Sequence, residues 1–191
     1  MAELKQENIS IQHLDELYSE MGLLESLTAI ITGGAVFRAL IQNEEPSDVD
    51  IMFSNKWDYL TVLSTLTSKG WHKIDQPQTP YYSGQSGEHH RVLMGKNDFP
   101  KLDLIYVSEY QDMTWGQVLA EFDLNLSQFA YTPGKLYWLN DARGDRRQDL
   151  AQKRLLVIQE KKTTQERFQK YLKLLSGQTQ DFKVGVQICG Q

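Results

Sequence analysis

Apolar residues recur along the chain with two different spacings, and together they predict a mixed fold of helices and strands. Residues 9–27 and 35–42 repeat apolar positions three and four apart, which is the spacing of one helix face. Short β-branched or alternating runs are typical of strands. Such runs lie at residues 27–32, 47–53, 71–74, 91–94, 102–107 and 135–139.

The segment 56–69 has helical spacing, with Leu60, Leu63 and Leu66 expected to face inward. Gly70 follows and is predicted to end this helix, because glycine readily adopts the left-handed backbone found after helices. Large aromatic side chains usually contribute to the core. The tryptophans expected there are Trp57, Trp71, Trp115 and Trp138.

The C-terminal part of the chain differs from the rest in charge. Residues 146–176 have a helical pattern, and residues 142–173 contain ten Lys or Arg against four Asp or Glu, a net charge of +6 in a chain of net charge −5. We therefore expect a head at residues 1–141 and a basic helical segment at 142–191 packed on it. The basic residues could contact RNA, although charged helix faces are often simply solvated.

Composition excludes several other classes of protein. The 191 residues are 40% hydrophobic and 24% charged, as in ordinary globular domains. Cys189 is the single cysteine, so an intramolecular disulfide and a cysteine metal cluster are both excluded. The first residues do not resemble a signal peptide, and no apolar run approaches the length of a membrane span. The sequence predicts a cytoplasmic protein with no membrane contact.

Two glycines stand between a predicted strand and a predicted helix. Gly33 and Gly34 follow Thr32 directly, and a glycine turn at a helix start lets backbone N–H groups approach a phosphate closely. The pattern is neither a P-loop nor a dinucleotide fingerprint, because no Gly-Lys-Ser/Thr and no third glycine follow. A different phosphate-binding fold is therefore indicated.

Paired carboxylates supply the second chemical signal. Asp48 and Asp50 are two positions apart on a predicted strand, so both side chains project from one face. Their mutual repulsion favours a bound cation, and oxygen ligands suit Mg²⁺ or Mn²⁺. An EF-hand is excluded because Phe53 occupies the position of its required glycine. Asp103, in an otherwise apolar strand, would complete a three-carboxylate site for two cations if the two strands are neighbours.

The order of these features resembles the nucleotidyltransferase superfamily that includes DNA polymerase beta. Within it, the chain is most similar to the head domain of the class II CCA-adding tRNA nucleotidyltransferases and poly(A) polymerases. The resemblance implies an α+β fold with a small, twisted, mostly antiparallel sheet flanked by helices and followed by a helical neck-like segment. It also implies two Mg²⁺ or Mn²⁺ ions and an NTP substrate, with Asp48, Asp50 and Asp103 as catalytic and metal-binding residues.

Two family motifs are matched only in part. After Gly33-Gly34, the family has an arginine where this chain has Phe37, and Arg38 comes one position late. A later family motif is matched at Asp123, but Phe122 replaces an arginine. The nucleotide-binding residues that the resemblance implies are Thr32, Gly33, Gly34, Arg38, Asp123 and Arg167. The tRNA-measuring parts of the family are missing from the sequence, so a compact phage- or toxin-type relative with a single head is expected.

Three functions are compatible with these residues. The first is transfer of a nucleoside monophosphate from an NTP to an RNA (tRNA-like) 3′ end, with release of pyrophosphate. The second is the same transfer to a hydroxyl of a protein or small molecule. The third is a catalytically silent protein that binds a nucleotide or a partner, suggested by the changed arginines. Retention of all three carboxylates favours an active enzyme.

Overall fold

The computed structural model describes residues 2–23, 28–42, 46–75, 87–152, 154–158 and 165–176. In these residues one sheet contains strands β1 (Glu3–Asn8), β2 (Ala29–Thr32), β3 (Asp48–Phe53), β4 (His72–Ile74), β5 (His89–Gly95), β6 (Lys101–Val107), β7 (Phe129–Thr132), β8 (Lys135–Asp141) and β9 (Gly144–Asp145). The helices are α1 (Gln12–Met21), α2 (Gly34–Gln42), α3 (Lys56–Ser68), α4 (Trp115–Ala120), α5 (Arg146–Ala151) and α6 (Gln165–Ser176). Short 3₁₀ turns, η2 (Ser108–Tyr110) and η3 (Asn125–Ser127), connect them.

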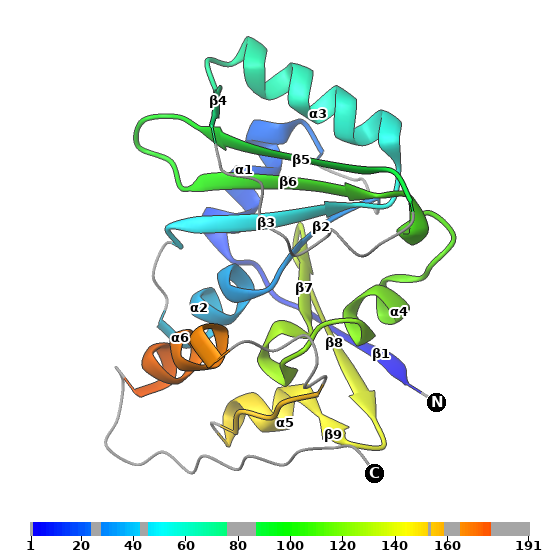
Figure 1. The fold of residues 1–191 in the computed structure, drawn as a ribbon. Helices are drawn as coiled ribbons and strands as arrows, with labels where there is room; N and C mark the ends of the chain where they lie inside the picture. The colour runs from blue at the N-terminus through cyan, green and yellow to red at the C-terminus, as the bar shows by residue number, and fades with distance from the viewer. Residues whose placement is uncertain are drawn as a thin grey trace.

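The strand order is β1-β8-β7-β2-β3-β6-β5-β4, with β9 beside β8. Strands β3 and β6 are parallel, and the other described pairs are antiparallel. The sheet is strongly twisted: β3, β5 and β6 run across Figure 1, whereas β7 and β8 cross them steeply. This mixed fold with a mostly antiparallel sheet confirms the predicted fold class.

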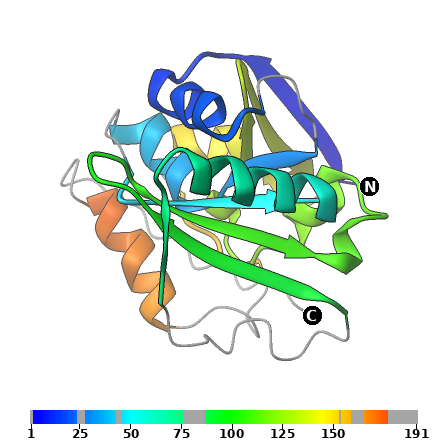
Figure 2. The same ribbon diagram turned by 90° about the horizontal axis from the view of Figure 1, so that it is seen from above.

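Helices cover both faces of the sheet. The larger core joins α1 and α3 to one face through Leu14, Val62, Ile51 and Leu104, among others. Figure 2 shows α1 and α3 on this side and α6 on the opposite side. The opposite face carries a smaller apolar cluster that includes Ile30 and packs against α4. The candidate site lies on this second face, next to the end of β2.

Some predicted elements differ from those in the structure. Strand β1 was not predicted, because it is a largely polar strand at the edge of the sheet and lacks an apolar pattern. The continuous helical segment predicted at 146–176 is wrong, since residues 154–158 separate α5 from α6. Within them Val157 forms a bridge to Leu124, and Leu156 donates its N–H to the side chain of Asn125.

The inward face of α3 was predicted in part, since Leu66 is buried and Leu63 packs against the larger core as expected. Tyr59, Val62 and Leu66 are buried, whereas Leu60 is 42% exposed. Trp57, expected in the core, is 77% exposed and is the second residue of α3. Among the described residues, no helix has the length and apolar character needed to cross a bilayer.

Candidate functional site

The glycine turn lies at the end of β2, where α2 begins. Gly33 has φ +69°, a left-handed conformation that is unfavourable for other residues. A Cβ atom on Gly33 would lie 3.1 Å from Oδ2 of Asp50, so the turn and the carboxylate are in close proximity. Glycine is therefore favoured here by its backbone conformation, and any Cβ atom would displace the Asp50 carboxylate slightly.

The candidate carboxylates lie on neighbouring strands in register. Thr32 on β2 is opposite Asp50 on β3, and Asp50 is paired with Asp103 on β6. Directly paired residues project from the same face of a sheet, and Asp48 shares that face because it lies two positions from Asp50. The strand adjacency that the sequence hypothesis required is thus present.

Asp103 is already paired within the protein. Its side chain is 6% exposed and accepts hydrogen bonds from Arg91 on β5, with Nε 2.9 Å from each carboxylate oxygen and Nη2 also bonded to Oδ2. Nothing in the sequence pattern indicates this pairing. Within the described ranges, no group of three or more His, Cys, Asp or Glu side chains is arranged to hold a metal ion.

Asp50 lies in an unfavourable electrostatic environment for a carboxylate. Burial, followed by the negative charges of Asp103 and Asp48, raises the pKa of Asp50 to about 6, while Arg167 and Lys170 partly oppose this effect. Asp50 makes no ion pair with another residue in the described part of the chain. A bound cation would relieve the repulsion.

The donor atoms at this site fit a hard divalent cation. Asp48 and Asp50 supply carboxylate oxygens beside a turn that only glycine leaves open, and carboxylate oxygen is the ligand type that Mg²⁺ and Mn²⁺ favour. The buried hydroxyl of Thr32 has no hydrogen-bond partner in the described residues and is a further polar group on this face. Asp103 would join the set only if Arg91 moves.

The changed motif after the glycines has a structural reason. Phe37 stands where the motif of the CCA-adding enzymes and poly(A) polymerases has an arginine. Its side chain is buried and packs on Tyr171 of α6, with ring centroids 5.7 Å apart. Arg38 instead reaches Ser47, whose hydroxyl donates to Asp48 at 2.8 Å. A positive side chain therefore remains near the first carboxylate despite the shift of one position.

Helix α6 brings the second motif into contact with the first. Arg167 donates to Oδ1 of the buried Asp123 at 3.0 Å, and Ser127 donates to the hydroxyl of Tyr171 at 2.9 Å. Oδ2 of Asp123 is buried and lacks a hydrogen-bond partner among the described residues. A Cβ atom on Gly34 would lie 3.8 Å from the Tyr171 hydroxyl. Asp123 and Arg167 are thus linked to the glycine turn through Ser127 and Tyr171.

Lys170 is a site residue that sequence reasoning missed. Its Nζ lies 3.8 Å from Oδ2 of Asp48. The sequence placed Lys170 only within a basic segment, and its contact depends on how α6 packs on the head. Helix α6 lies beside α2 in Figure 1, in keeping with the ring contact between them.

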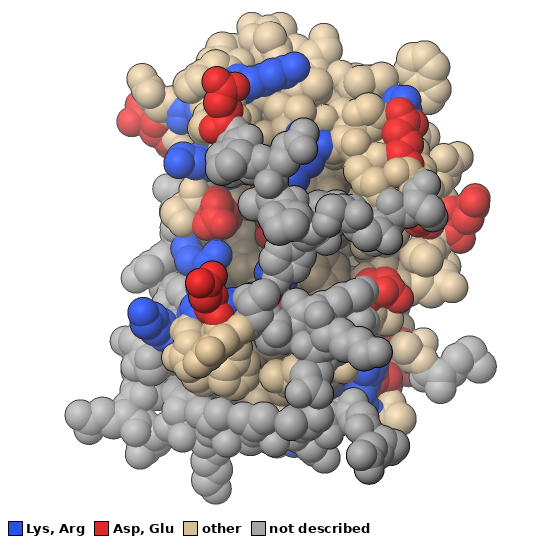
Figure 3. All heavy atoms as spheres, viewed as in Figure 1, with Lys and Arg blue, Asp and Glu red and all other residues tan. Residues whose placement is uncertain are grey.

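Much of the basic C-terminal charge is paired inside the protein. Arg146 is fully buried and bonds Gln128, Asp141 and the backbone of Gly144. At least six basic residues make intramolecular ion pairs, namely Arg143, Arg146, Arg147, Arg154, Arg167 and Lys170. Figure 3 accordingly shows acidic and basic side chains intermixed on the visible face. Less positive charge is available for a polyanion than the sequence suggests.

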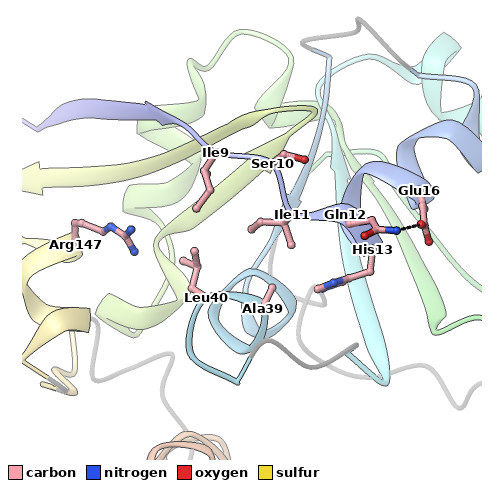
Figure 4. A pocket seen from close by; sticks show the side chains of 9 residues that line it. All are labelled: Ile9, Ser10, Ile11, Gln12, His13, Glu16, Ala39, Leu40 and Arg147. Carbon is pink, nitrogen blue, oxygen red and sulfur yellow. Dashed lines mark hydrogen bonds between the residues drawn. The ribbon is translucent and has the colours of Figure 1, made fainter.

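A cavity of about 620 Å³ lies apart from the carboxylates, between the start of α1 and helix α2. Figure 4 shows Ile11, Ala39 and Leu40 around it, with Arg147 at one side. Nε2 of His13, which also lines it, has no hydrogen-bond partner among the described residues. The cavity contains none of the predicted site residues.

Comparison with solved structures places this fold among the nucleotidyltransferase-like folds. A structure described as a tRNA-processing enzyme in its apo form I superposes with a TM-score of 0.53 and 19% identity, covering 80% of this chain and 39% of that one. A CCA-adding enzyme with CTP gives 0.51 and 14%, covering 81% and 37%. The Thermotoga maritima CCA-adding enzyme complexed with tRNA gives 0.51 and 14%, covering 82% and 36%. The chain thus spans less than half the length of these structures.

Sequence comparison assigns the family. A model of the Gabija anti-defense 2 family matches residues 4–148, which include the glycine turn, the three carboxylates and Asp123. The chain belongs to the Gabija anti-defense 2 family. No curated protein matches the sequence.

Proposed function

We propose that this protein is a metal-dependent nucleotidyltransferase that transfers a nucleoside monophosphate from an NTP to an acceptor hydroxyl. The observation that carries the proposal is the registered row Thr32, Asp50 and Asp103, next to the left-handed turn at Gly33. The glycine turn can bind phosphates, and the adjacent carboxylates favour a bound cation. The nucleotidyltransferase-like fold supports the same chemistry.

In this proposal the acceptor oxygen attacks the α-phosphorus of the NTP. A new P–O bond forms, the bond from the α-phosphorus to the bridging oxygen breaks, and pyrophosphate leaves with that oxygen. The acceptor hydroxyl loses its proton to a neighbouring base, a role for which Asp103 is our candidate. Bound Mg²⁺ or Mn²⁺, held by Asp48 and Asp50, would supply positive charge to the triphosphate and lower the pKa of the hydroxyl.

The residues of the chain would hold the nucleotide from two sides. Backbone N–H groups at Gly33 and Gly34 and the N-terminus of the nine-residue helix α2 are suited to the triphosphate. Arg38 is close enough to Asp48, through Ser47, to contribute positive charge there. Asp123, whose buried Oδ2 lacks a hydrogen-bond partner among the described residues, would accept a hydrogen bond from the nucleoside only if this oxygen becomes accessible.

The acceptor that we propose first is an RNA 3′ hydroxyl, since similar folds occur in CCA-adding enzymes. A second candidate is a hydroxyl on a component of the Gabija defence system. Two observations favour this alternative: the family description names an anti-defence role, and six basic residues of the C-terminal segment are neutralised internally.

One labelling experiment tests the reaction and separates the acceptors. The protein is incubated with each α-labelled NTP, Mg²⁺ and either total RNA or an extract of cells carrying the defence system. Asp50→Asn serves as the inactive variant, and Asp112→Asn, at an exposed position away from the site, is the matched control. Labelled RNA supports the first acceptor and labelled protein the second. Absence of label from every molecule with all four NTPs would overturn the proposed function.

A further inference from the structure

Arg91 is bound to the carboxylate of Asp103, which a two-metal site would need as a ligand. The guanidinium holds Asp103 through both oxygens, and the Arg91 side chain is 32% exposed whereas that of Asp103 is 6% exposed. An arginine bound bidentately is a strong and geometrically specific partner for a carboxylate. The pair therefore competes directly with a cation for the same oxygens.

We propose that Arg91 is a latch on Asp103 that the triphosphate of the incoming nucleotide releases, so that cation binding at the carboxylates becomes dependent on substrate. The proposal rests on the proposed function, because it assumes that an NTP and a divalent cation bind at this site. It adds a regulating residue that neither the fold nor the carboxylate pattern identifies.

The position of Arg91 on the sheet allows this exchange. Strand β5 carries Arg91 and lies beside β6, which in turn lies beside β3 with Asp50. Neighbouring strands are about 4.8 Å apart, so the strand of Arg91 and the strand of Asp50, which are two strands apart, are separated by roughly 10 Å in total. An arginine side chain that is one-third exposed can turn toward a phosphate over much of that distance.

The chemistry of arginine explains why a triphosphate would release the latch. Guanidinium groups bind phosphate oxygens in the same bidentate manner as carboxylates, so Arg91 would exchange one anionic partner for another. Asp103 would then offer its oxygens beside Asp50. In the latched state the site lacks its third carboxylate and holds a cation weakly, which limits cation binding before the substrate arrives.

Linkage makes this latch measurable without turnover. If the nucleotide raises the affinity for the cation by releasing Arg91, the cation raises the affinity for the nucleotide by the same factor. Loss of the latch should therefore strengthen cation binding in the absence of nucleotide and reduce the coupling between the two ligands. We expect changes of about tenfold, within the usual range for coupled sites.

The test measures Mn²⁺ binding by electron paramagnetic resonance, with and without an α,β-methylene NTP analogue that cannot be transferred. The variants are Arg91→Gln and Arg91→Lys, the second keeping a positive charge beside the buried Asp103 in case the first fails to fold. Lys73→Gln on β4 removes one positive charge from an exposed position nearby and is the matched control. Thermal unfolding verifies that each variant is folded.

The latch predicts that Arg91→Gln binds Mn²⁺ more tightly than the wild type without nucleotide, that Arg91→Lys does so by a smaller factor because it loses the bidentate contact but keeps the charge, and that the analogue then raises the affinity of both variants less. The control should behave like the wild type. Equal Mn²⁺ affinity in the wild type and a folded Arg91 variant, with unchanged coupling, would overturn the latch and leave the proposed function standing. Failure of every variant and of the wild type to bind both Mn²⁺ and analogue would overturn the proposed function and the latch together.

Discussion

Replacing Asp50 with asparagine is predicted to stabilise the metal-free protein while abolishing its response to metal. The pKa of Asp50 is raised from 3.8 to about 6 by burial and by its acidic neighbours Asp103 and Asp48. A carboxyl whose pKa is higher in the folded state destabilises that state once it is ionised. The destabilisation is absent at low pH, where both states are protonated, and grows as the pH rises through the folded-state pKa.

The magnitude follows from this shift in pKa. Each pKa unit corresponds to about 1.4 kcal/mol, so ionised Asp50 costs the folded protein about 3 kcal/mol at about pH 7.5 and about half that at about pH 5. The isosteric asparagine removes the charge and retains the shape. We therefore expect the free energy of unfolding of Asp50→Asn to exceed that of the wild type by up to these amounts.

Urea denaturation in the presence of EDTA, at about pH 5 and at about pH 7.5, measures the difference in the free energy of unfolding between Asp50→Asn and the wild type. Asp112→Asn, which removes an exposed carboxylate, should leave the free energy of unfolding nearly unchanged. Added Mg²⁺ should stabilise the wild type by mass action and leave Asp50→Asn unaffected. The reasoning is refuted if Asp50→Asn is no more stable than the wild type near neutral pH, or if its advantage does not grow between the two pH values.

Three further predictions concern the turn, the buried arginine and α6. Gly33→Ala should abolish Mn²⁺ and nucleotide binding, as measured by titration calorimetry. Gly134 has nearly the same φ, +71°, but open space around it, so Gly134→Ala should lower only the stability, as measured by thermal unfolding. Arg146→Met should lower the free energy of unfolding by about 1 to 3 kcal/mol in urea denaturation, because Gln128, Asp141 and Asp149 lose a fully buried partner while Asp141 keeps Arg143 and Asp149 keeps Arg154, and an unchanged free energy of unfolding would contradict this. Lys170→Gln should change stability by less than about 1 kcal/mol, since its ion pair is half exposed, yet raise Mn²⁺ affinity in the same resonance assay; unchanged affinity would exclude Lys170 as a competitor for Asp48.

Much of the architecture was predictable because it depends on local patterns. The strand of Asp48 and Asp50 and the strand of Asp103 each show a clear alternation or apolar run, and the structure places them side by side. The edge strand β1 was not predictable in this way, because a strand with one paired edge and two largely polar faces needs no apolar pattern. Its formation depends on pairing with β8, which is distant in sequence.

The composition of the site was predictable only in part. Gly33 and the aspartates carry strong local signals, since their residue types are demanded by backbone conformation and charge. The partners of those aspartates carry none: Arg91 and Lys170 meet Asp103 and Asp48 only because of strand order and the packing of α6. Trp57 is a similar case, since it is a large hydrophobic residue and yet 77% exposed near the start of α3, whereas Tyr59 in the same turn is buried.

The most direct test of the central claim is a single-turnover measurement of pyrophosphate release and label transfer from an α-labelled NTP in the presence of Mg²⁺ and acceptor. The wild type and Asp112→Asn are expected to release pyrophosphate in step with labelling of the acceptor, and Asp50→Asn, although at least as stable, is expected to do neither. Transfer by Asp50→Asn at the wild-type rate would contradict the assignment of this carboxylate row as a nucleotidyltransferase site.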